Sequence, residues 1–350
     1  MEGTRLRAGV VGPGTIGELH VRTLRSLGIQ VRALVASSLE SAKGHAQRLE
    51  IEHVYDSVAA MAGSGEVDVV HVCTPNVLHA SAATQALEGG CDVVCEKPLT
   101  FDLATADDLL RMVESAGAKG GVCYHYRCLE GIAVARSLVQ SGALGSVRML
   151  AGRYLSQELR DVPAAHWLTD AAIVGPSRSL ADVGVHWFDL AEHVSGQSIK
   201  AVLAQPAGTS ESEPFLHGAA VLLRLEEDTP ATVVVSQDCF GVSQDEIALE
   251  VQGSAGTLRW SLDEDGERLI VWREDGSQLE RTMYAKSFQA GTERAFQALM
   301  SGLYDRIQGG QSPAPTFADG QHGVAILHAA VQSAAQGGWV EVPPTVPLRS

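Results

Sequence analysis

Two short stretches in the first hundred residues carry residue types that could act together in catalysis. A turn containing Gly12, Gly14 and Gly17 directly follows an apolar run, and Lys97 directly follows the apolar run CDVVC at 91–95. Ligands of open α/β sheets bind outside the carboxyl ends of the strands. The turn therefore predicts a nucleotide cradle. Lys97 offers a cation at a strand end, where it could stabilise negative charge on a reacting oxygen.

The glycine turn has the spacing of a dinucleotide-binding fingerprint and precedes a helical pattern. Gly12 allows the tight turn, Gly14 allows the backbone to approach a pyrophosphate, and Gly17 allows close helix packing. With Thr15 and Ile16, these glycines are the predicted cofactor-binding residues of the turn. An ordinary glycine-rich turn is the alternative, but it does not explain why all three glycines have this spacing at this place.

The end of the second expected strand bears on the choice between NAD and NADP. An acidic residue about 20 residues after the turn would bind the ribose 2′-hydroxyl of NAD. Here the strand ends in Val-Ala followed by Ser37 and Ser38, without a carboxylate. We therefore favour NADP over NAD, with both serines as candidate ligands. Ser37 and Glu40 also have the spacing of a helix capping box, and the two roles are compatible.

Oxidation of a secondary alcohol removes a hydride and a proton, so the site needs a base as well as a cation. Asp182 and His186 lie four residues apart, which places them on one face of a helix, where the carboxylate can fix the histidine tautomer. A capping aspartate with a core histidine is the structural alternative. A metal site that also uses Asp189 and His193 is a further alternative, but we predict no metal.

The order of apolar runs predicts an α/β domain followed by an α+β domain. Up to about residue 125, short strands alternate with amphipathic helices, as in a parallel doubly wound sheet. After it, strands follow one another through turns, which indicates a large, mainly antiparallel open sheet. We expect a Rossmann NAD(P)-binding domain at 1–124 and a substrate-binding and oligomerisation domain at 125–350.

The expected elements are as follows. Strands of the first domain are expected at 6–11, 31–36, 67–73, 92–95 and 120–124, and helices at 17–27, 39–49, 58–61, 78–88 and 104–115. Strands of the second are expected at 147–155, 201–204, 219–225, 231–239, 246–251, 256–262 and 268–273, and helices at 132–141, 288–301 and 319–336.

Composition restricts the partners and the compartment. The 350 residues include 26 Lys and Arg against 42 Asp and Glu, a formal net charge of −16. Such a chain repels phosphate backbones and anionic lipids, so we expect neither nucleic acid nor membrane as a partner. The charged N-terminus passes directly into the first strand, and the six cysteines occur mostly within apolar runs, as reduced thiols do. These features predict a cytoplasmic protein.

Together these motifs resemble the Gfo/Idh/MocA oxidoreductases, a family that includes glucose-fructose oxidoreductase and inositol dehydrogenases. The resemblance covers nearly the whole chain, with the motifs in the family's order. They are the glycine turn, Thr74-Pro75-Asn76-Val77-Leu78-His79, Glu96-Lys97-Pro98, Tyr126-Arg127, Asp182 to His186, and the ending 315–320 with 338–343.

The resemblance implies roles for the candidate residues. Lys97 would orient and polarise a substrate oxygen, His186 would be the general acid or base, and Asp182 would support the histidine and contact substrate. It also implies a cis peptide before Pro98. Asn76, His79 and Glu96 would line the nicotinamide end, and Thr74, Pro75 and Lys97 are further expected cofactor-binding residues. The residues expected to bind substrate, besides the three catalytic ones, are Tyr126, His166 and Trp167.

The expected activity is NAD(P)-dependent hydride transfer to or from a secondary alcohol or ketone of a sugar, inositol or related polyol. Relatives often carry a run of glycines before the D-x-x-x-H motif, whereas Gly175-Pro176-Ser177 stands here, so the substrate pocket differs. A non-catalytic NAD(P)-binding regulator is one alternative. A redox-recycling sugar lyase or glycosidase is another. A homodimer or homotetramer is expected, because one face of the second sheet would lack helices of its own.

Overall fold

The computed structural model describes residues 6–160, 162, 167–207, 214–242, 245–274, 276–283, 285 and 287–345. These residues form two compact units. The first, called the Rossmann unit below, contains residues 6–123 and 297–324, and the second contains residues 124–296 and 325–344.

The Rossmann unit is built on a six-stranded parallel sheet in the order β3-β2-β1-β4-β5-β6. This is the doubly wound order, and its direction reverses between β1 and β4. The α/β prediction for this part is confirmed. The strands are β1 (Arg7–Val11), β2 (Gln30–Val35), β3 (His53–Tyr55), β4 (Val69–Val72), β5 (Asp92–Cys95) and β6 (Gly120–Val122).

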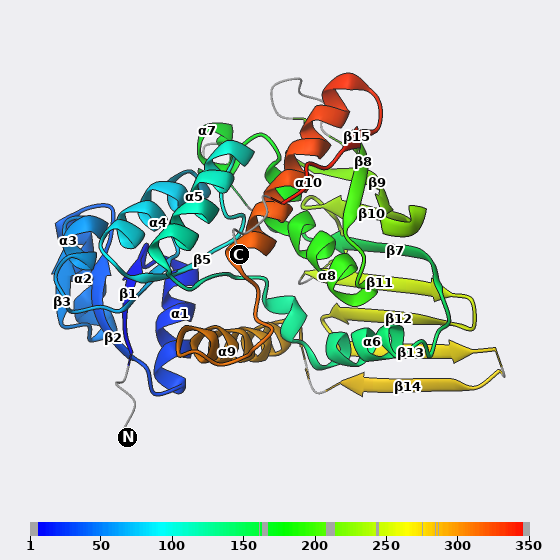
Figure 1. Ribbon diagram of the computed structural model, residues 1–350, viewed down its shortest axis with the longest axis horizontal. Helices are drawn as coiled ribbons and strands as arrows, with labels where there is room; N and C mark the ends of the chain where they lie inside the picture. Colours follow the sequence, from blue (N-terminus) through cyan, green and yellow to red (C-terminus); the bar gives the residue numbers. More distant parts are fainter. Residues whose placement is uncertain are drawn as a thin grey trace. The chain divides into compact units, whose positions relative to one another are not determined.

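The helices of this unit follow the strands along the chain (Figure 1). Val10, Val70 and Val94 are fully buried in the central strands, because helices cover both faces of a doubly wound sheet. This explains why the strands appear in the sequence as continuous apolar runs. The helices are α1 (Thr15–Ser26), α2 (Leu39–Leu49), α3 (Val58–Ala62), α4 (His79–Glu88), preceded by the 3-10 turn η1 (Asn76–Leu78), and α5 (Leu103–Ala116).

A late segment of the chain completes the Rossmann unit. Residues 297–324, which the sequence analysis assigned to the second domain, include the end of α9 (Phe288–Ile307) and the start of α10 (Phe317–Gln336). The ring of Phe317 packs against Gly120 of β6, where a Cβ would lie 2.2 Å from Phe317 Cδ2. Glycine in β6 therefore leaves the space into which this aromatic ring packs.

The second unit contains a nine-stranded sheet in the order β14-β13-β12-β11-β7-β10-β9-β8-β15. Its neighbours are antiparallel except for the parallel pair β7 and β10, so the predicted, mainly antiparallel sheet is confirmed. The strands are β7 (Val147–Leu155), β8 (Ile199–Pro206), β9 (Gly218–Leu225), β10 (Pro230–Ser236), β11 (Glu246–Gly253), β12 (Gly256–Asp263), β13 (Gly266–Arg273), β14 (Gln278–Met283) and β15 (Val340–Glu341).

Helices α6 (Glu130–Gln140) and α8 (Val185–Ser195) pack on this sheet, α8 against β7 and β11, and α6 against β12 and β13 (Figure 1). The indole of Trp187 on α8 donates to the carbonyl of Ala248, 2.9 Å away, over the space that Gly152 leaves open. The shorter elements are η2 (His125–Cys128), η3 (Glu158–Arg160), η4 (Trp167–Thr169), α7 (Ala171–Val174) and the π-helix η5 (Leu180–Gly184). No described helix combines the length and apolar character that a membrane span requires.

Candidate active site

The glycine turn joins β1 to α1, and two of its glycines are required by the fold itself. Gly12 has a positive φ of 85°, and a Cβ there would lie 2.7 Å from the carbonyl oxygen of Cys73. A Cβ on Gly17 would lie 2.2 Å from the carbonyl oxygen of Gly12. Any larger residue at either position would therefore collide with backbone.

Gly14 is different, because a Cβ there would meet no atom within 4 Å. The residue is exposed and is the N-cap of α1, whose first N–H groups point out of the helix end. The fold alone does not require glycine here. Close approach of a ligand to the backbone would require it, and a helix N-terminus favours an anionic ligand. This open space at a glycine fits the pyrophosphate of a dinucleotide.

At the end of β2, Ser38 caps α2 by accepting a hydrogen bond from the backbone N–H of Ser41, 3.1 Å away. The capping box proposed for Ser37 and Glu40 is therefore wrong by one residue, since the chain turns into the helix at Ser38. Both serines are exposed at the carboxyl end of β2. In this fold, the residue that contacts the adenine ribose lies at the carboxyl end of the second strand, which is where these serines are.

His79, expected at the nicotinamide end, joins two loops of the Rossmann unit. The ring is buried, with Nδ1 2.7 Å from the carbonyl oxygen of Pro98 and Nε2 2.9 Å from that of Thr74. Burial lowers the pKa of His79, although both carbonyl contacts oppose this shift. The histidine thus ties the loop after β4 to the loop that carries Lys97, and both ring nitrogens are used in doing so.

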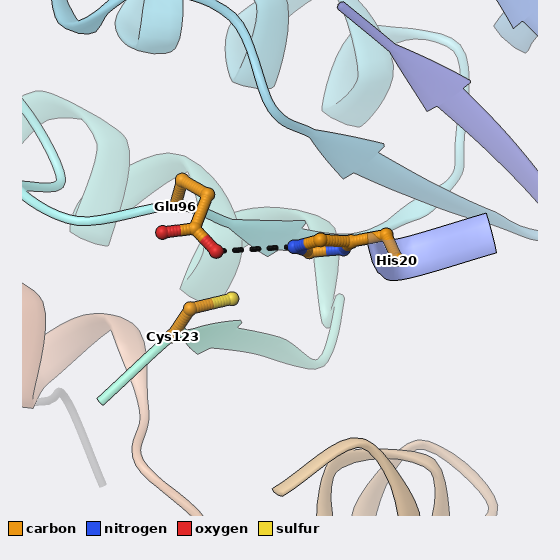
Figure 2. Close-up of side chains that lie close together, drawn as sticks. All are labelled: His20, Glu96 and Cys123. Carbon is orange, nitrogen blue, oxygen red and sulfur yellow. Dashed lines mark hydrogen bonds and ion pairs between the residues drawn. The ribbon is translucent and has the colours of Figure 1, made fainter. Parts of the chain in front are cut away.

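Glu96 lies between β5 and Lys97, and its carboxylate has partners on several sides (Figure 2). Its Oε1 lies 3.1 Å from His20 Nε2, and its Oε2 accepts from the backbone N–H of Lys97 at 3.2 Å. Cys123 also hydrogen-bonds this carboxylate, and burial raises the pKa of the Cys123 thiol well above its usual value. The predicted cis peptide between Lys97 and Pro98 is confirmed.

The histidine behind Glu96 continues into a buried chain of hydrogen bonds. His20 Nδ1 lies 2.9 Å from His71 Nδ1, and His71 Nε2 lies 2.9 Å from the hydroxyl of Tyr304 on α9. Burial holds the pKa of His71 well below its usual value, so this ring is neutral. If Glu96 accepts from His20, one neutral tautomer of each histidine satisfies every contact, with Tyr304 donating to His71.

His20, Glu96 and Cys123 are also the one group among the described residues whose metal-ligating atoms cluster, all within 4.8 Å of one another (Figure 2). His20 and Cys123 each bond to Glu96, so hydrogen bonds within the protein account for the proximity of these three groups. Of the alternative metal ligands considered from the sequence, Asp189 forms a buried ion pair with Arg127. The absence of a metal remains a prediction.

In the second unit, Asp182 and His186 lie on consecutive helical segments. Asp182 is within the π-helix η5, whereas His186 is at the start of α8 and is 4% exposed. The single α-helix expected from their spacing is thus interrupted by a wider turn, a feature often found at functional sites. Their four-residue spacing alone could not reveal this.

The Asp182 carboxylate is held by two buried polar side chains. Arg178 Nη1 lies 2.9 Å from Asp182 Oδ2, and Gln237 Nε2 donates to the same oxygen at 2.7 Å. Arg178 and Gln237 are 4% and 0% exposed, respectively.

Aromatic side chains surround His186. The rings of Tyr126 and His125 lie 4.9 Å and 5.0 Å from its ring, both edge-on. The hydroxyl of Tyr126, an expected substrate ligand, lies 2.8 Å from that of Tyr154, which donates to Asp245. Burial raises the pKa of both tyrosines, so they stay protonated. Tyr126 therefore helps to form the wall around His186.

Two further expected substrate residues are less defined. His166 lies outside the described residues, and Trp167 begins η4 without a described side chain. The remaining expected cofactor-binding residues lie in two turns. Thr15 and Ile16 begin α1, and Ile16 is 44% exposed. Thr74 and Pro75 follow β4 and lead into η1, which begins at Asn76.

Two family models match this chain, one in its N-terminal part and one in its C-terminal part. A family model described as "Oxidoreductase family, NAD-binding Rossmann fold" matches residues 6–124. A second, "Oxidoreductase family, C-terminal alpha/beta domain", matches residues 136–342. The chain belongs to the Gfo/Idh/MocA family of oxidoreductases.

Individual relatives cover almost the full length of this Gfo/Idh/MocA chain. Levoglucosan dehydrogenase of Pseudarthrobacter phenanthrenivorans is 24% identical over 97% of this chain and 98% of its own. Inositol 2-dehydrogenase 1 of Saccharopolyspora erythraea is 27% identical over 96% of each chain. An oxidoreductase domain protein from Kribbella flavida superposes with a TM-score of 0.87 at 25% identity, over 97% of this chain and 100% of its own. The similarity therefore extends through both units.

Several residues of this family member that bond to predicted site residues were not themselves predicted from the sequence. His20 follows Gly17 by three residues, within one helical turn. This spacing places it on the same face of the helix as Gly17 and could have indicated it. Arg178 precedes Asp182 by four residues, a spacing that favours an ion pair on a helix. Gln237 lies just after β10, far from Asp182 in sequence, and no local pattern indicates it.

Proposed function

We propose that this protein transfers a hydride between NAD(P) and a secondary alcohol or ketone of a neutral sugar, inositol or related polyol. The observation that carries the proposal is the occurrence of two features on one parallel sheet. Gly14, open to a ligand, follows β1, and Lys97 follows β5, with only β4 between these strands. Both lie at carboxyl ends, where ligands of this fold bind.

In the direction of alcohol oxidation, the substrate carbon loses a hydride and its hydroxyl loses a proton. Bound NAD(P) supplies the hydride acceptor, at C4 of the nicotinamide. We assign Lys97 to orient the hydroxyl and to stabilise negative charge on its oxygen. His186 takes the proton, and Asp182 supports the histidine and contacts the substrate. Reduction of a ketone uses the same residues in reverse.

The proposed substrate class is supported by the names of relatives, which include levoglucosan dehydrogenase, inositol 2-dehydrogenase and 1,5-anhydro-D-fructose reductase. All three names denote neutral molecules that carry several hydroxyl groups. Tyr126, His166 and Trp167 remain our proposed substrate-binding residues. Residues 1–124 would hold the cofactor and residues 125–350 the substrate.

For the cofactor, the exposed Ser37 and Ser38 at the end of β2 support NADP, because no carboxylate is present there to repel a 2′-phosphate. Levoglucosan dehydrogenase has been solved with NADH, and this supports NAD. We favour NADP. Titration of the protein with NADP⁺ and NAD⁺, with Ser37→Asp as a variant, tests this choice. The aspartate should weaken NADP⁺ binding more than NAD⁺ binding.

The activity is tested by following cofactor absorbance with NAD⁺ or NADP⁺ and a panel of inositols, aldoses and anhydrosugars. Reduction by the wild-type protein and none by Lys97→Ala would support the proposal. Tight cofactor binding without turnover on any substrate would favour a non-catalytic regulator. Conversion of a sugar without net cofactor reduction would favour a redox-recycling lyase or glycosidase.

We also propose a homodimer or homotetramer formed through the nine-stranded sheet. Leu222 and Val234 are 47% and 50% exposed, and the register places both on the face opposite α8. Aspartate at both positions should lower the mass measured by light scattering, whereas Leu39→Asp on α2 should leave it unchanged. A wild-type monomer would contradict the assembly. All six cysteines are free thiols, which supports a cytoplasmic location.

A further inference from the structure

Arg178 is an unusually placed arginine in the second unit. Its side chain is 5% exposed and makes its polar contacts with neighbouring protein groups. Nε donates to the carbonyl oxygen of Leu168 at 2.8 Å, and Nη1 donates to Asp182 Oδ2 at 2.9 Å. Nη2 lies 3.6 Å from Glu158 Oε2. A buried guanidinium is costly unless it is paired, so its position is set by these groups.

Gln237 closes the arrangement. Its Oε1 accepts from Arg178 Nη1 at 2.9 Å, while its Nε2 donates to Asp182 Oδ2 at 2.7 Å and to Glu158 Oε2 at 2.9 Å. Carboxylates only accept and guanidinium groups only donate, so a single amide orientation satisfies all three contacts. Arg178, Gln237 and Asp182 therefore form a triangle of hydrogen bonds, which we call the Asp182 clamp.

The backbone holds the clamp in place as well. Ser179, directly after the arginine, donates from its N–H and from its hydroxyl to the carbonyl oxygen of Phe215, at 3.2 and 2.7 Å. The chain then enters η5, which carries Asp182. The backbone next to Arg178 is thus held in place. The arginine side chain extends along one helical turn to reach the Asp182 carboxylate.

We propose that Arg178, together with Gln237, is a positioning residue that fixes the orientation of the Asp182 carboxylate for catalysis. This inference rests on the proposed function, because it assigns the clamp a role through Asp182. The clamp engages Oδ2 with two donors, so rotation of the carboxylate would break both bonds. Arg178 itself is a positioning residue and need not touch the substrate.

Lysine cannot reproduce this geometry, because its ammonium is a point charge, whereas the guanidinium donates to Leu168 from Nε and to both Gln237 and Asp182 from Nη1. We therefore expect Arg178→Met to lower kcat roughly 100-fold, as small misplacements of catalytic groups do. Arg178→Lys should recover part of this loss. Affinity for the cofactor should stay within about twofold, because its proposed ligands belong to the Rossmann unit.

The test is a double-mutant cycle with Arg178→Met, Asp182→Asn and the combined variant, in the full-length protein. If Arg178 acts through Asp182, its replacement should lower kcat much less when Asp182 is already asparagine. Arg259→Met is the matched control, since Arg259 is exposed and its described contacts, an ion pair with Glu250 and a cation–π contact with Trp272, lie within the same sheet. Equal fold-losses of kcat in both backgrounds would overturn the proposal.

Thermal unfolding of the same variants separates this inference from the proposed function. Coupling should make the loss of Tm in the combined variant smaller than the sum of the two single losses. If the wild-type protein turns over no substrate in the panel, the proposed function fails. In that case the Tm measurements alone test the clamp, and additive losses of Tm would overturn it. If turnover is present, additive kcat losses overturn the positioning role even where the Tm losses are coupled.

Discussion

The ring of His79 at the start of α4 is tied to the carbonyl oxygen of Pro98, 2.7 Å from its Nδ1. The other ring nitrogen, Nε2, lies 2.9 Å from the carbonyl oxygen of Thr74. The loop that follows β4 and the loop that carries Lys97 therefore share one buried side chain. The backbone around Lys97 is therefore held on two sides, by the contact of His79 with Pro98 and by the hydrogen bond from the Lys97 N–H to Glu96.

Replacing His79 with leucine should destabilise the protein and reduce turnover. The change removes the imidazole from its buried contact with the Pro98 carbonyl and from its partly buried contact with the Thr74 carbonyl, which should cost about 2–3 kcal/mol of the free energy of unfolding. Urea denaturation measures this cost. His79→Gln is the control, because its amide can still donate to one carbonyl and should recover part of the loss. A leucine variant as stable as the wild type would contradict the bracing role.

Gly14→Val should weaken cofactor binding at least about tenfold while leaving stability nearly unchanged, because the added side chain enters open space that we assign to the pyrophosphate. Gly44, exposed on α2, also has nothing within 4 Å of its ideal Cβ, so Gly44→Val is a matched control. Fluorescence titration with NAD⁺ and NADP⁺ measures both. Equal affinities for the two variants would contradict the cradle at Gly14.

Glu267 should make stability depend on pH. Its buried carboxylate accepts from Trp260 Nε1 and from the backbone N–H of Gly131, at 2.8 and 2.7 Å. Burial nevertheless raises the pKa of Glu267 from its ordinary 4.5, and Glu130 adds to this. The folded protein thus keeps the proton to higher pH than the unfolded chain, so stability is lost as pH rises from about 4.5 through the folded value.

Glu267→Gln keeps both acceptor contacts without burying a charge. At pH 8 the variant should exceed the wild type by on the order of 1 kcal/mol, and the difference should vanish near pH 4. Denaturation at a series of pH values measures this. A difference that does not change with pH would contradict the assignment.

Packing of Phe317 against β6 predicts that Gly120→Ala is destabilising by about 1–3 kcal/mol, because the new methyl group would meet the ring. Phe317→Leu alone should also destabilise the protein. The combined variant should be more stable than the sum of the two losses predicts. Additive losses would contradict the contact that assigns 297–324 to the Rossmann unit.

Much of the fold could be predicted because buried strands of parallel sheets are continuous apolar runs, as in 92–95. Three strands were missed, β3 with three half-buried residues and β14 and β15 at the two edges of their sheet, since none has a strong apolar pattern. Asp182 and His186 were found through a motif. Gln237 was not, because its contact joins residues 55 positions apart, and only the folded chain brings them together.

We expect Lys97 to lie at the nicotinamide end but assign its main role to hydride transfer, so its loss should affect turnover far more than cofactor affinity. Parallel measurement of kcat and of cofactor Kd in the wild type and in Lys97→Met, which keeps the length of the side chain, tests this assignment most directly. We predict that kcat falls at least about 100-fold while Kd changes less than about threefold. Undiminished turnover in Lys97→Met, on a substrate that the wild type oxidises, would contradict the account.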